Sequence, residues 1–358
     1  MDNNQLPLIF DGHNDVLLKL FNMKDSHAHD KFLQGYDGGH LDLPRMQKGG
    51  FGGGFFAIYI PSDLDLDLAS LMAEMSKPQY DIALPEEIPF QTALPIAIRK
   101  AAILSRIERE SKGAVKICTN STELRQCFKT NTIAVIMHVE GAEAIGEDFS
   151  GFEVLYRAGL RSVGPVWSRP TRFGHGVPFR YPASPDTGPG LTDLGKELVR
   201  ICNEFKVVID LAHLNEAGFW DVAKLSNAPL IVTHSNAHAL CQLTRNLTDR
   251  QLAAVRHSGG VVGLNFATSA LRADGQSSAD TSIDEMIRHL EYLIEQVGID
   301  GVALGSDFDG ATISDEIADV SGLPALRKKM RQAGYDEATM KKLCHENWFD
   351  VLERTFGC

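Results

Sequence analysis

Histidines and carboxylates follow five short apolar runs in this sequence. The motifs are "FDGHNDVL" with His13 and Asp15, "IAVIMHVEGAEAI" with His138 and Glu140, "VVIDLAHLN" with Asp210 and His213, "PLIVTHSNAH" with His234, and "GVALGSDFDG" with Asp307 and Asp309. In an extended segment, residues two apart point to the same face, so His13 and Asp15 would emerge together. Imidazole and carboxylate groups together suit Zn²⁺ or a similar divalent ion. The motifs therefore predict a metal site.

Each of these residues also has a simpler explanation when it is taken alone. A single histidine after a strand is more often a capping or core residue, and a single aspartate there is usually a helix N-cap. Asp210 precedes its strand end and is typical of a structural partner, and Asp309 is typical of a turn. The coincidence of such residues at five strand ends favours a functional site.

The elements that would position these residues are eight apolar runs, mostly continuous and rich in Val and Ile, as strands buried on both faces tend to be. The runs are 6–10, 55–60, 133–137, 160–166, 207–211, 230–232, 261–266 and 302–304. Helical patterns lie between them; for example, Ser282 and Glu285 form a capping-box pattern ahead of "MIRHLEYLIEQVG". This alternation predicts a TIM-like (β/α)8 barrel whose functional residues gather at the carboxyl face. A doubly wound sheet is the alternative that periodicity leaves open.

Two connections, residues 61–95 and 168–190, are long for such a fold. Both follow strand ends, so they would hang over the carboxyl face of the barrel as lids or substrate walls. The glycine-rich stretch "GGFGGGFF" lacks the Lys-Ser/Thr of a phosphate-binding loop and predicts a tight turn at the barrel floor.

Bulk properties narrow the class of protein. The 358 residues carry a formal net charge of −12, which argues against a nucleic-acid partner. No apolar segment is long enough to span a bilayer, and the first residues lack the pattern of a signal peptide. Six scattered cysteines without a CxxC pair favour reduced thiols. We expect one barrel domain over residues 1–358 and a cytoplasmic location.

Six motifs, in order, make the sequence resemble the membrane dipeptidase (renal dipeptidase) family: "DGHND", "VEGAEAI", "DLAH", "THSNAH", "RNLTD" and "GSDFDG". The family is built on a metal-dependent amidohydrolase-type barrel with a binuclear zinc centre. The resemblance implies that one metal is held by His13, Asp15 and Glu140. It implies that the other is held by Glu140, His213 and His234, with Glu140 bridging. Arg245 would bind the substrate carboxylate, and Asp307 would be the catalytic acid/base.

The resemblance predicts a zinc-dependent dipeptidase with two Zn²⁺ per chain that tolerates a D-residue on the carboxyl side of the substrate. Two ions about 3.5–4 Å apart can share one hydroxide and lower its pKa. The partner would be a small dipeptide rather than nucleic acid or a membrane, and a homodimer is left open. The alternatives are a related binuclear amidohydrolase acting on N-acyl amino acids, lactams or lactones, and an accessory protein that has lost catalysis.

The fourth strand end departs from the family. In the animal enzymes it carries a histidine that helps to polarise the scissile carbonyl, whereas the matching residue here is Trp167. An indole can donate one hydrogen bond but cannot become cationic. His175, between two glycines in "RFGHGV", is the nearest substitute donor, although its simpler interpretation is a solvated loop histidine.

Overall fold

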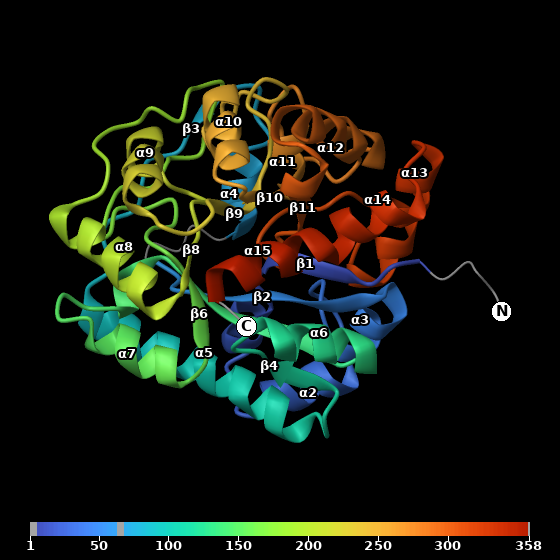
Figure 1. Ribbon diagram of the computed structural model, residues 1–358, viewed down its shortest axis with the longest axis horizontal. Helices are drawn as coiled ribbons and strands as arrows, with labels where there is room; N and C mark the ends of the chain where they lie inside the picture. Colours follow the sequence, from blue (N-terminus) through green and yellow to red (C-terminus); the bar gives the residue numbers. More distant parts are fainter. Residues whose placement is uncertain (1–5, 63–67, 357–358) are drawn as a thin grey trace.

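The structure, a computed structural model, describes residues 6–62 and 68–356 of the chain. Within the described residues, its main sheet has nine parallel strands, and eight of them pair in chain order around a barrel (Figure 1). A parallel bridge between Asp210 and Ile231 joins the two ends of the sheet. The predicted (β/α)8 barrel is therefore confirmed. The barrel strands are β1 (Ile9–Asn14), β2 (Phe51–Tyr59), β5 (Ile133–Glu140), β6 (Leu160–Gly164), β8 (Val208–Ile209), β9 (Ile231–Ser235), β10 (Val261–Asn265) and β11 (Val302–Gly305).

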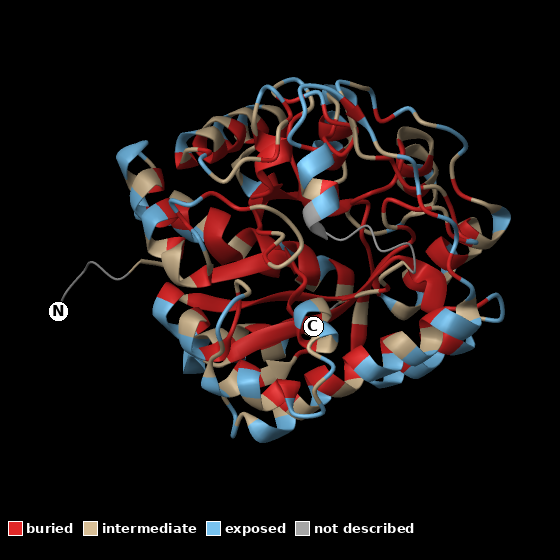
Figure 2. Cartoon of the chain, turned by 180° about the vertical axis from the view of Figure 1, so that it is seen from behind, coloured by how far each residue is buried: buried red, intermediate tan, exposed pale blue. Residues whose placement is uncertain are grey.

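Helices surround these strands, and the exposed residues of the helices lie mainly on their outer faces (Figure 2). Their starts follow capping chemistry: Ser282 accepts a backbone hydrogen bond before α12, and Thr248 forms a capping box with Gln251 before α10. The helices are α1 (Val16–Asn22), α2 (Ala28–Gln34), α3 (Leu43–Gly49), α4 (Leu68–Glu74), α5 (Phe90–Glu110), α6 (Ser121–Thr130), α7 (Ser150–Arg157), α8 (Asp193–Phe205), α9 (Glu216–Leu225), α10 (Asp249–His257), α11 (Thr268–Leu271), α12 (Ile283–Val297), α13 (Leu323–Gln332), α14 (Glu337–Lys341) and α15 (Asn347–Phe356).

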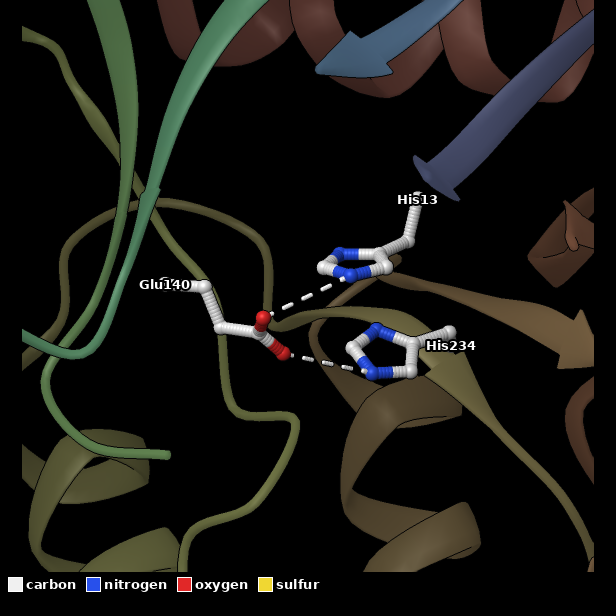
Figure 3. Close-up of side chains that lie close together, drawn as sticks. All are labelled: His13, Glu140 and His234. Carbon is white, nitrogen blue, oxygen red and sulfur yellow. Dashed lines mark ion pairs between the residues drawn. The ribbon is translucent and has the colours of Figure 1, made fainter. Parts of the chain in front are cut away.

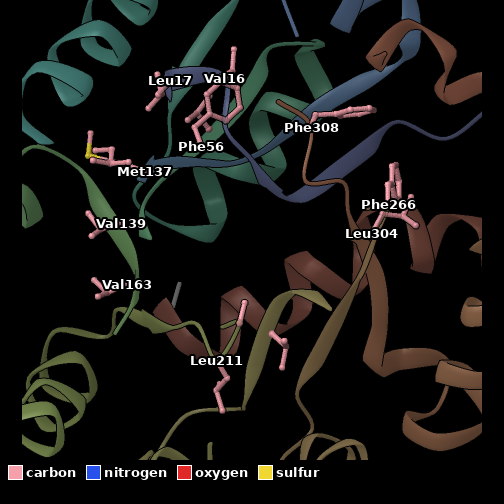
Figure 4. Packing of buried hydrophobic residues seen from close by; sticks show 14 of the residues in the cluster. Val16, Leu17, Phe56, Met137, Val139, Val163, Leu211, Phe266, Leu304 and Phe308 are labelled. Atoms are coloured by element: carbon pink, nitrogen blue, oxygen red, sulfur yellow. The ribbon is translucent and has the colours of Figure 1, made fainter. Parts of the chain in front are cut away.

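Alternation along β5 shows how the barrel positions its polar residues. Met137 and Val139 point outward into the core between strands and helices (Figure 4). Ala134 and Ile136 belong to a separate apolar cluster that includes Phe10, Phe55 and Trp348 of α15. His138 and Glu140 follow on that same inner side, at the carboxyl end, because side chains alternate along a strand. The barrel interior is thus apolar at one end and ionisable at the other.

Segments of the two long connections pair with each other. Strand β3 (Tyr80–Asp81) lies in the first connection and β7 (Arg180–Tyr181) in the second, and the two form a small antiparallel sheet. The first connection also contains α4 and the start of α5, so it is less of a loop than the sequence predicts. The "SDLDLDL" stretch in that connection lies largely outside the described residues.

The glycine-rich stretch at residues 49–56 is not a turn as predicted; its greater part belongs to strand β2. A Cβ at Gly53 would lie 2.1 Å from the Ala134 carbonyl oxygen, and one at Gly54 would lie 2.7 Å from that of Asp11. The glycines therefore let β2 pack closely between β1 and β5. A short strand that the sequence did not predict, β4 (Val115–Ile117), pairs with the start of β5.

Five cysteines in the described part of the chain are free and buried, as expected of reduced thiols. No helix within the described ranges has the length and apolarity needed to cross a membrane.

Candidate metal centre and active site

The barrel brings the five predicted metal ligands into one cluster at its carboxyl end. His13 lies in β1, Glu140 ends β5 and His234 lies in β9, whereas Asp15 and His213 follow β1 and β8. All five side chains are buried. Asp15 occupies the N-cap position of α1, yet its carboxylate makes no capping bond and instead lies 3.2 Å from His13 Nε2. The N-cap explanation of Asp15 is therefore excluded.

The Glu140 carboxylate lies between two sets of donor atoms. Its Oε2 is 3.6 Å from His13 Nε2, and its Oε1 is 3.1 Å from His213 Nε2 and 3.7 Å from His234 Nε2. Figure 3 shows His13 and His234 facing opposite oxygens of this carboxylate. We call His13, Asp15 and Asp307 the His13 side of the cluster, and His213 with His234 the His234 side.

The donor chemistry of both sides fits divalent metal ions. On the His234 side, two imidazole nitrogens lie only 3.2 Å apart and share one Glu140 oxygen, an arrangement that calls for a cation or proton between them. On the His13 side, Asp15 Oδ1 has no hydrogen-bond partner within the described ranges. A Cβ at Gly310 would lie 2.3 Å from Asp15 Oδ2 and 2.4 Å from Asp307 Oδ1, so glycine keeps the space between these carboxylates open.

Charges differ between the two sides. Burial opposes protonation of His13, but Glu140 and Asp15 outweigh it and raise the pKa of His13 to about 10. Burial raises the pKa of Glu140 to about 8. Burial, together with the positive charges of Arg245 and His13, holds the pKa values of His213 and His234 well below the usual histidine range. The His234 side therefore offers neutral imidazoles, and the His13 side offers an excess of acidic groups.

Asp307 lies beside the cluster and accepts a hydrogen bond from Asn265. Its backbone adopts a left-handed conformation with φ of 58°, which is unusual for an aspartate and frequent at functional sites. Asn265 Nδ2 donates to Asp307 Oδ2 at 3.0 Å, while Asn265 Oδ1 accepts from the Ala267 N–H at 2.6 Å. That second bond fixes the orientation of the Asn265 amide. Burial is the main cause that raises the pKa of Asp307.

A cavity of about 990 Å³ opens onto this cluster, and both long connections contribute to its wall. Asp15, Glu140, His213, Asp307 and Arg245 all line it. Arg245 is 8% exposed and donates to the His234 carbonyl oxygen, and it forms no ion pair within the described residues. A buried arginine of this kind can bind an anion in the cavity.

The family model of the membrane dipeptidases (peptidase family M19) matches residues 4–356 of the chain. The chain belongs to the membrane dipeptidase family.

Solved structures support this membership. A metallo peptidase from Rhodobacter sphaeroides, liganded with a phosphinate mimic of the dipeptide L-Ala-D-Ala, is 55% identical with a TM-score of 0.96, covering 98% of this chain and 100% of its own. Dipeptidase AC, also a metallo peptidase, is 54% identical with a TM-score of 0.96, covering 99% and 100%. A Klebsiella pneumoniae protein in the pqqA 5′ region is 45% identical over 74% of this chain and 97% of its own length. The chain is thus an M19 metallo-dipeptidase, a hydrolase that acts on peptide bonds.

Trp167 and His175, the two residues considered at the fourth strand end of this M19 chain, lie in different places. Trp167 lines the cavity, with its ring centroid 5.7 Å from that of His213 and 5.0 Å from that of Tyr59. His175 is absent from the cavity wall, and its Nδ1 lies 3.2 Å from the Gly190 carbonyl oxygen. The position of His175 therefore agrees with its interpretation as a loop histidine.

Two polar residues, one in this M19 site and one behind its wall, were missed in the sequence. Asn265 ends the seventh barrel strand, and it would have been found if amides had been considered at strand ends along with ionisable groups. Lys100 lies on α5, is fully buried, and donates to the Tyr59 carbonyl oxygen at 2.5 Å. No local pattern marks Lys100, because it occupies an apolar position in an otherwise ordinary amphipathic helix.

Proposed function

We propose that this chain is a zinc-dependent dipeptidase that holds two zinc ions, one on each side of Glu140. The observation that carries the proposal is the position of the Glu140 carboxylate, whose two oxygens face separate sets of buried donors. His13, Asp15 and Glu140 would hold one ion, and Glu140, His213 and His234 the other. Five ligands with a shared carboxylate are too many for a single tetrahedral zinc site.

Zinc, when bound, would supply a Lewis acid that polarises the scissile carbonyl and activates water. The protein would supply the proton transfers. Asp307 is buried beside the cluster, and burial raises its pKa, which suits a carboxylate that must both accept and donate a proton. Asn265 donates to Oδ2, so Oδ1 is the oxygen left to take a proton from the attacking water and deliver it to the leaving amine.

Substrate length would be set by Arg245. Its guanidinium lines the cavity without a carboxylate partner within the described residues, and its planar donors suit a free α-carboxylate. Trp167 and Phe179 add apolar wall beside His213. Because the 55% identical relative was solved with a mimic of L-Ala-D-Ala, we propose that this chain accepts dipeptides with a D-residue on the carboxyl side.

The test combines metal analysis with a substrate panel. Protein stripped of metal and reloaded with zinc should contain two zinc ions per chain, and activity should follow the metal content. The panel should include L-Ala-D-Ala, L-Ala-L-Ala, a tripeptide and an N-acetyl amino acid, with amine release as the readout. We expect turnover of dipeptides and poor turnover of the last two. One zinc per chain at saturation, or preference for the N-acetyl amino acid, would contradict the proposal.

A further inference from the structure

Asp210 is a buried carboxylate beneath the metal ligands that the proposed mechanism does not use. Its Oδ1 accepts the backbone N–H groups of Ala212 at 3.0 Å and Thr233 at 2.9 Å. Its Oδ2 lies 2.6 Å from Thr233 Oγ1, whereas His138 Nε2 is farther away at 3.6 Å. Asp210 is thus the acceptor in all three of these hydrogen bonds, with Thr233 Oγ1 donating to Oδ2.

The Thr233 hydroxyl has a single proton, and Asp210 receives it. The same oxygen lies 2.8 Å from His234 Nδ1. With its own proton already donated, Thr233 Oγ1 can only accept in this second contact, so His234 Nδ1 must carry a proton. A neutral imidazole that is protonated at Nδ1 keeps its lone pair at Nε2. That nitrogen is the one 3.7 Å from Glu140 Oε1 and 3.2 Å from His213 Nε2.

We propose that Asp210 and Thr233 are positioning residues that hold His234 in the tautomer whose Nε2 can bind a metal ion. This inference rests on the proposed metal-binding role of His234. His213, the second histidine on that side, lacks an equivalent pair of positioning residues. Ser168 Oγ lies 2.9 Å from His213 Nδ1, but within the described residues no acceptor takes the Ser168 proton. Ser168 can therefore donate or accept, and it does not select a tautomer.

Asp210→Asn gives the sharpest test because it reverses the direction of the hydrogen bonds. The two backbone N–H groups require an acceptor at the Oδ1 position, so the new amide nitrogen would replace Oδ2 and donate to Thr233 Oγ1. Thr233 would then donate its proton to His234 Nδ1, which leaves the ring proton on Nε2. Thr233→Val removes the hydroxyl that links Asp210 to His234, a link that we call the relay, and Thr233→Ser keeps it. Thr355→Val is the matched control, because it deletes a buried hydroxyl in α15, on the apolar side of the barrel.

The first readout is the tautomer of His234 in the metal-free, full-length chain, measured by ¹⁵N NMR of histidine-labelled protein. His234 signals are those that His234→Gln removes. We expect Nδ1–H in the wild type, Thr233→Ser and Thr355→Val, and Nε2–H in Asp210→Asn. Retention of Nδ1–H in Asp210→Asn would overturn the proposal, and so would Nε2–H in the wild type.

The second readout is zinc affinity, measured by competition with a chromophoric chelator. One of the two bound equivalents should weaken by about 10–100-fold in Thr233→Val and Asp210→Asn, the usual effect of removing a partner behind a metal ligand. Thr233→Ser should stay within about threefold, and Thr355→Val should match the wild type. Equal weakening by serine and valine would overturn the relay. If the wild type binds no zinc at all, the proposed function fails, whereas the NMR result still decides the tautomer.

Discussion

The two sides of the proposed metal-binding cluster differ in how they accommodate buried charge. The His13 side gathers two carboxylates around one imidazole, and Glu140 and Asp15 raise the pKa of that imidazole to about 10 against the effect of burial. The His234 side consists of two imidazoles whose pKa values burial and nearby positive charge hold well below the usual range. Glu140 belongs to both, with one oxygen facing each side.

The difference in charge between the two sides is related to the position of Arg245. Arg245, the proposed partner of the substrate carboxylate, lines the same cavity as the cluster, and its positive charge lowers the pKa values of His213 and His234. Because His213 and His234 are neutral, the His234 side adds no negative charge beyond that of Glu140. A further carboxylate there would pair with Arg245 and compete with the substrate carboxylate. The acidic residues that would offset the charge of the proposed metal ions are instead gathered on the opposite side of Glu140.

Glu140→Gln should have the largest effect, because it is the one substitution that acts on both sides. An amide cannot supply two anionic oxygens, so we expect less than one zinc per chain and a fall in kcat/KM on the order of 10³-fold. Asp15→Asn, which acts on the His13 side alone, should retain one zinc. Elemental analysis after dialysis measures both. A full equivalent of tightly bound zinc in Glu140→Gln would assign Glu140 to one side only.

Asp307→Asn separates proton transfer from metal binding on the His13 side. Asp307 lies close enough to His13 and Asp15 to be a ligand, whereas we propose that it moves protons. As a proton shuttle, it should lower kcat by at least about a hundredfold when replaced by asparagine, with two zinc ions retained. Loss of one zinc in this variant would make Asp307 a ligand, and a kcat above a tenth of the wild-type value would remove it from the chemistry.

Arg245→Ala tests the positive charge beside the His234 side. We expect a loss of roughly 2–4 kcal/mol in transition-state binding, measured as kcat/KM, for free dipeptides. Dipeptide amides lack the carboxylate, so they should be poor substrates of the wild type and nearly insensitive to the substitution. Arg161→Ala, which removes a half-buried arginine hydrogen-bonded to the Thr119 carbonyl oxygen, is the control. Equal losses on dipeptides and amides would place Arg245 outside the substrate site.

Lys100→Met examines the buried lysine whose pKa is lowered by burial and raised, to a smaller extent, by Asp15 and Glu140. Burial lowers the pKa of Lys100 to about 7 in the folded chain, against about 10.4 in the unfolded chain. Between these values only the unfolded chain holds the proton, so this lysine makes the free energy of unfolding rise with pH. Below pH 7 both states hold the proton, and the contribution is constant.

The wild type should therefore gain about 1–3 kcal/mol relative to Lys100→Met between pH 7 and 9. Urea unfolding of metal-free protein at pH 6.5, 7.5 and 9 measures this difference. Lys224→Met, at an exposed position on α9, should follow the wild type at every pH. A constant difference between wild type and Lys100→Met over this range would show that Lys100 stays charged when folded.

The sequence predicts the clustering of these residues well because they sit at strand ends, where order along the chain implies proximity in space. His13, Glu140 and His234 come from strands far apart in sequence, yet a parallel barrel brings all carboxyl ends to one face. Strand boundaries were less accurate. Residues 6–10 were predicted as the first strand, whereas β1 runs from Ile9 to Asn14 and includes His13 itself. A hydropathy pattern ends a strand at its first polar residues, whereas polar side chains inside a barrel can continue the strand because neighbouring groups hydrogen-bond to them.

Contacts that depend on packing across the barrel could not be predicted. Gly53 suggests a turn by composition, but the close approach of Ala134 makes glycine necessary within a strand. The pairing of β3 with β7 joins two connections that have no complementary pattern in sequence. Lys100 and Asn265 matter because Lys100 donates to the Tyr59 carbonyl oxygen and Asn265 donates to Asp307. A single sequence does not specify such neighbours in space.

His175→Ala should have the smallest effect of these substitutions. The sequence resemblance implies that Trp167 stands where the animal enzymes carry an oxyanion histidine, and His175 could compensate only if it reached the cavity. Its Nδ1 is instead 3.2 Å from the Gly190 carbonyl oxygen, and it lies outside the cavity wall. We therefore expect less than a threefold change in kcat, with both zinc ions retained, so that stabilisation of the oxyanion rests on the metal ions and on the Trp167 indole. A fall of about 10²-fold, the usual cost of losing one oxyanion donor, would show that the 168–190 connection moves His175 into the site during turnover.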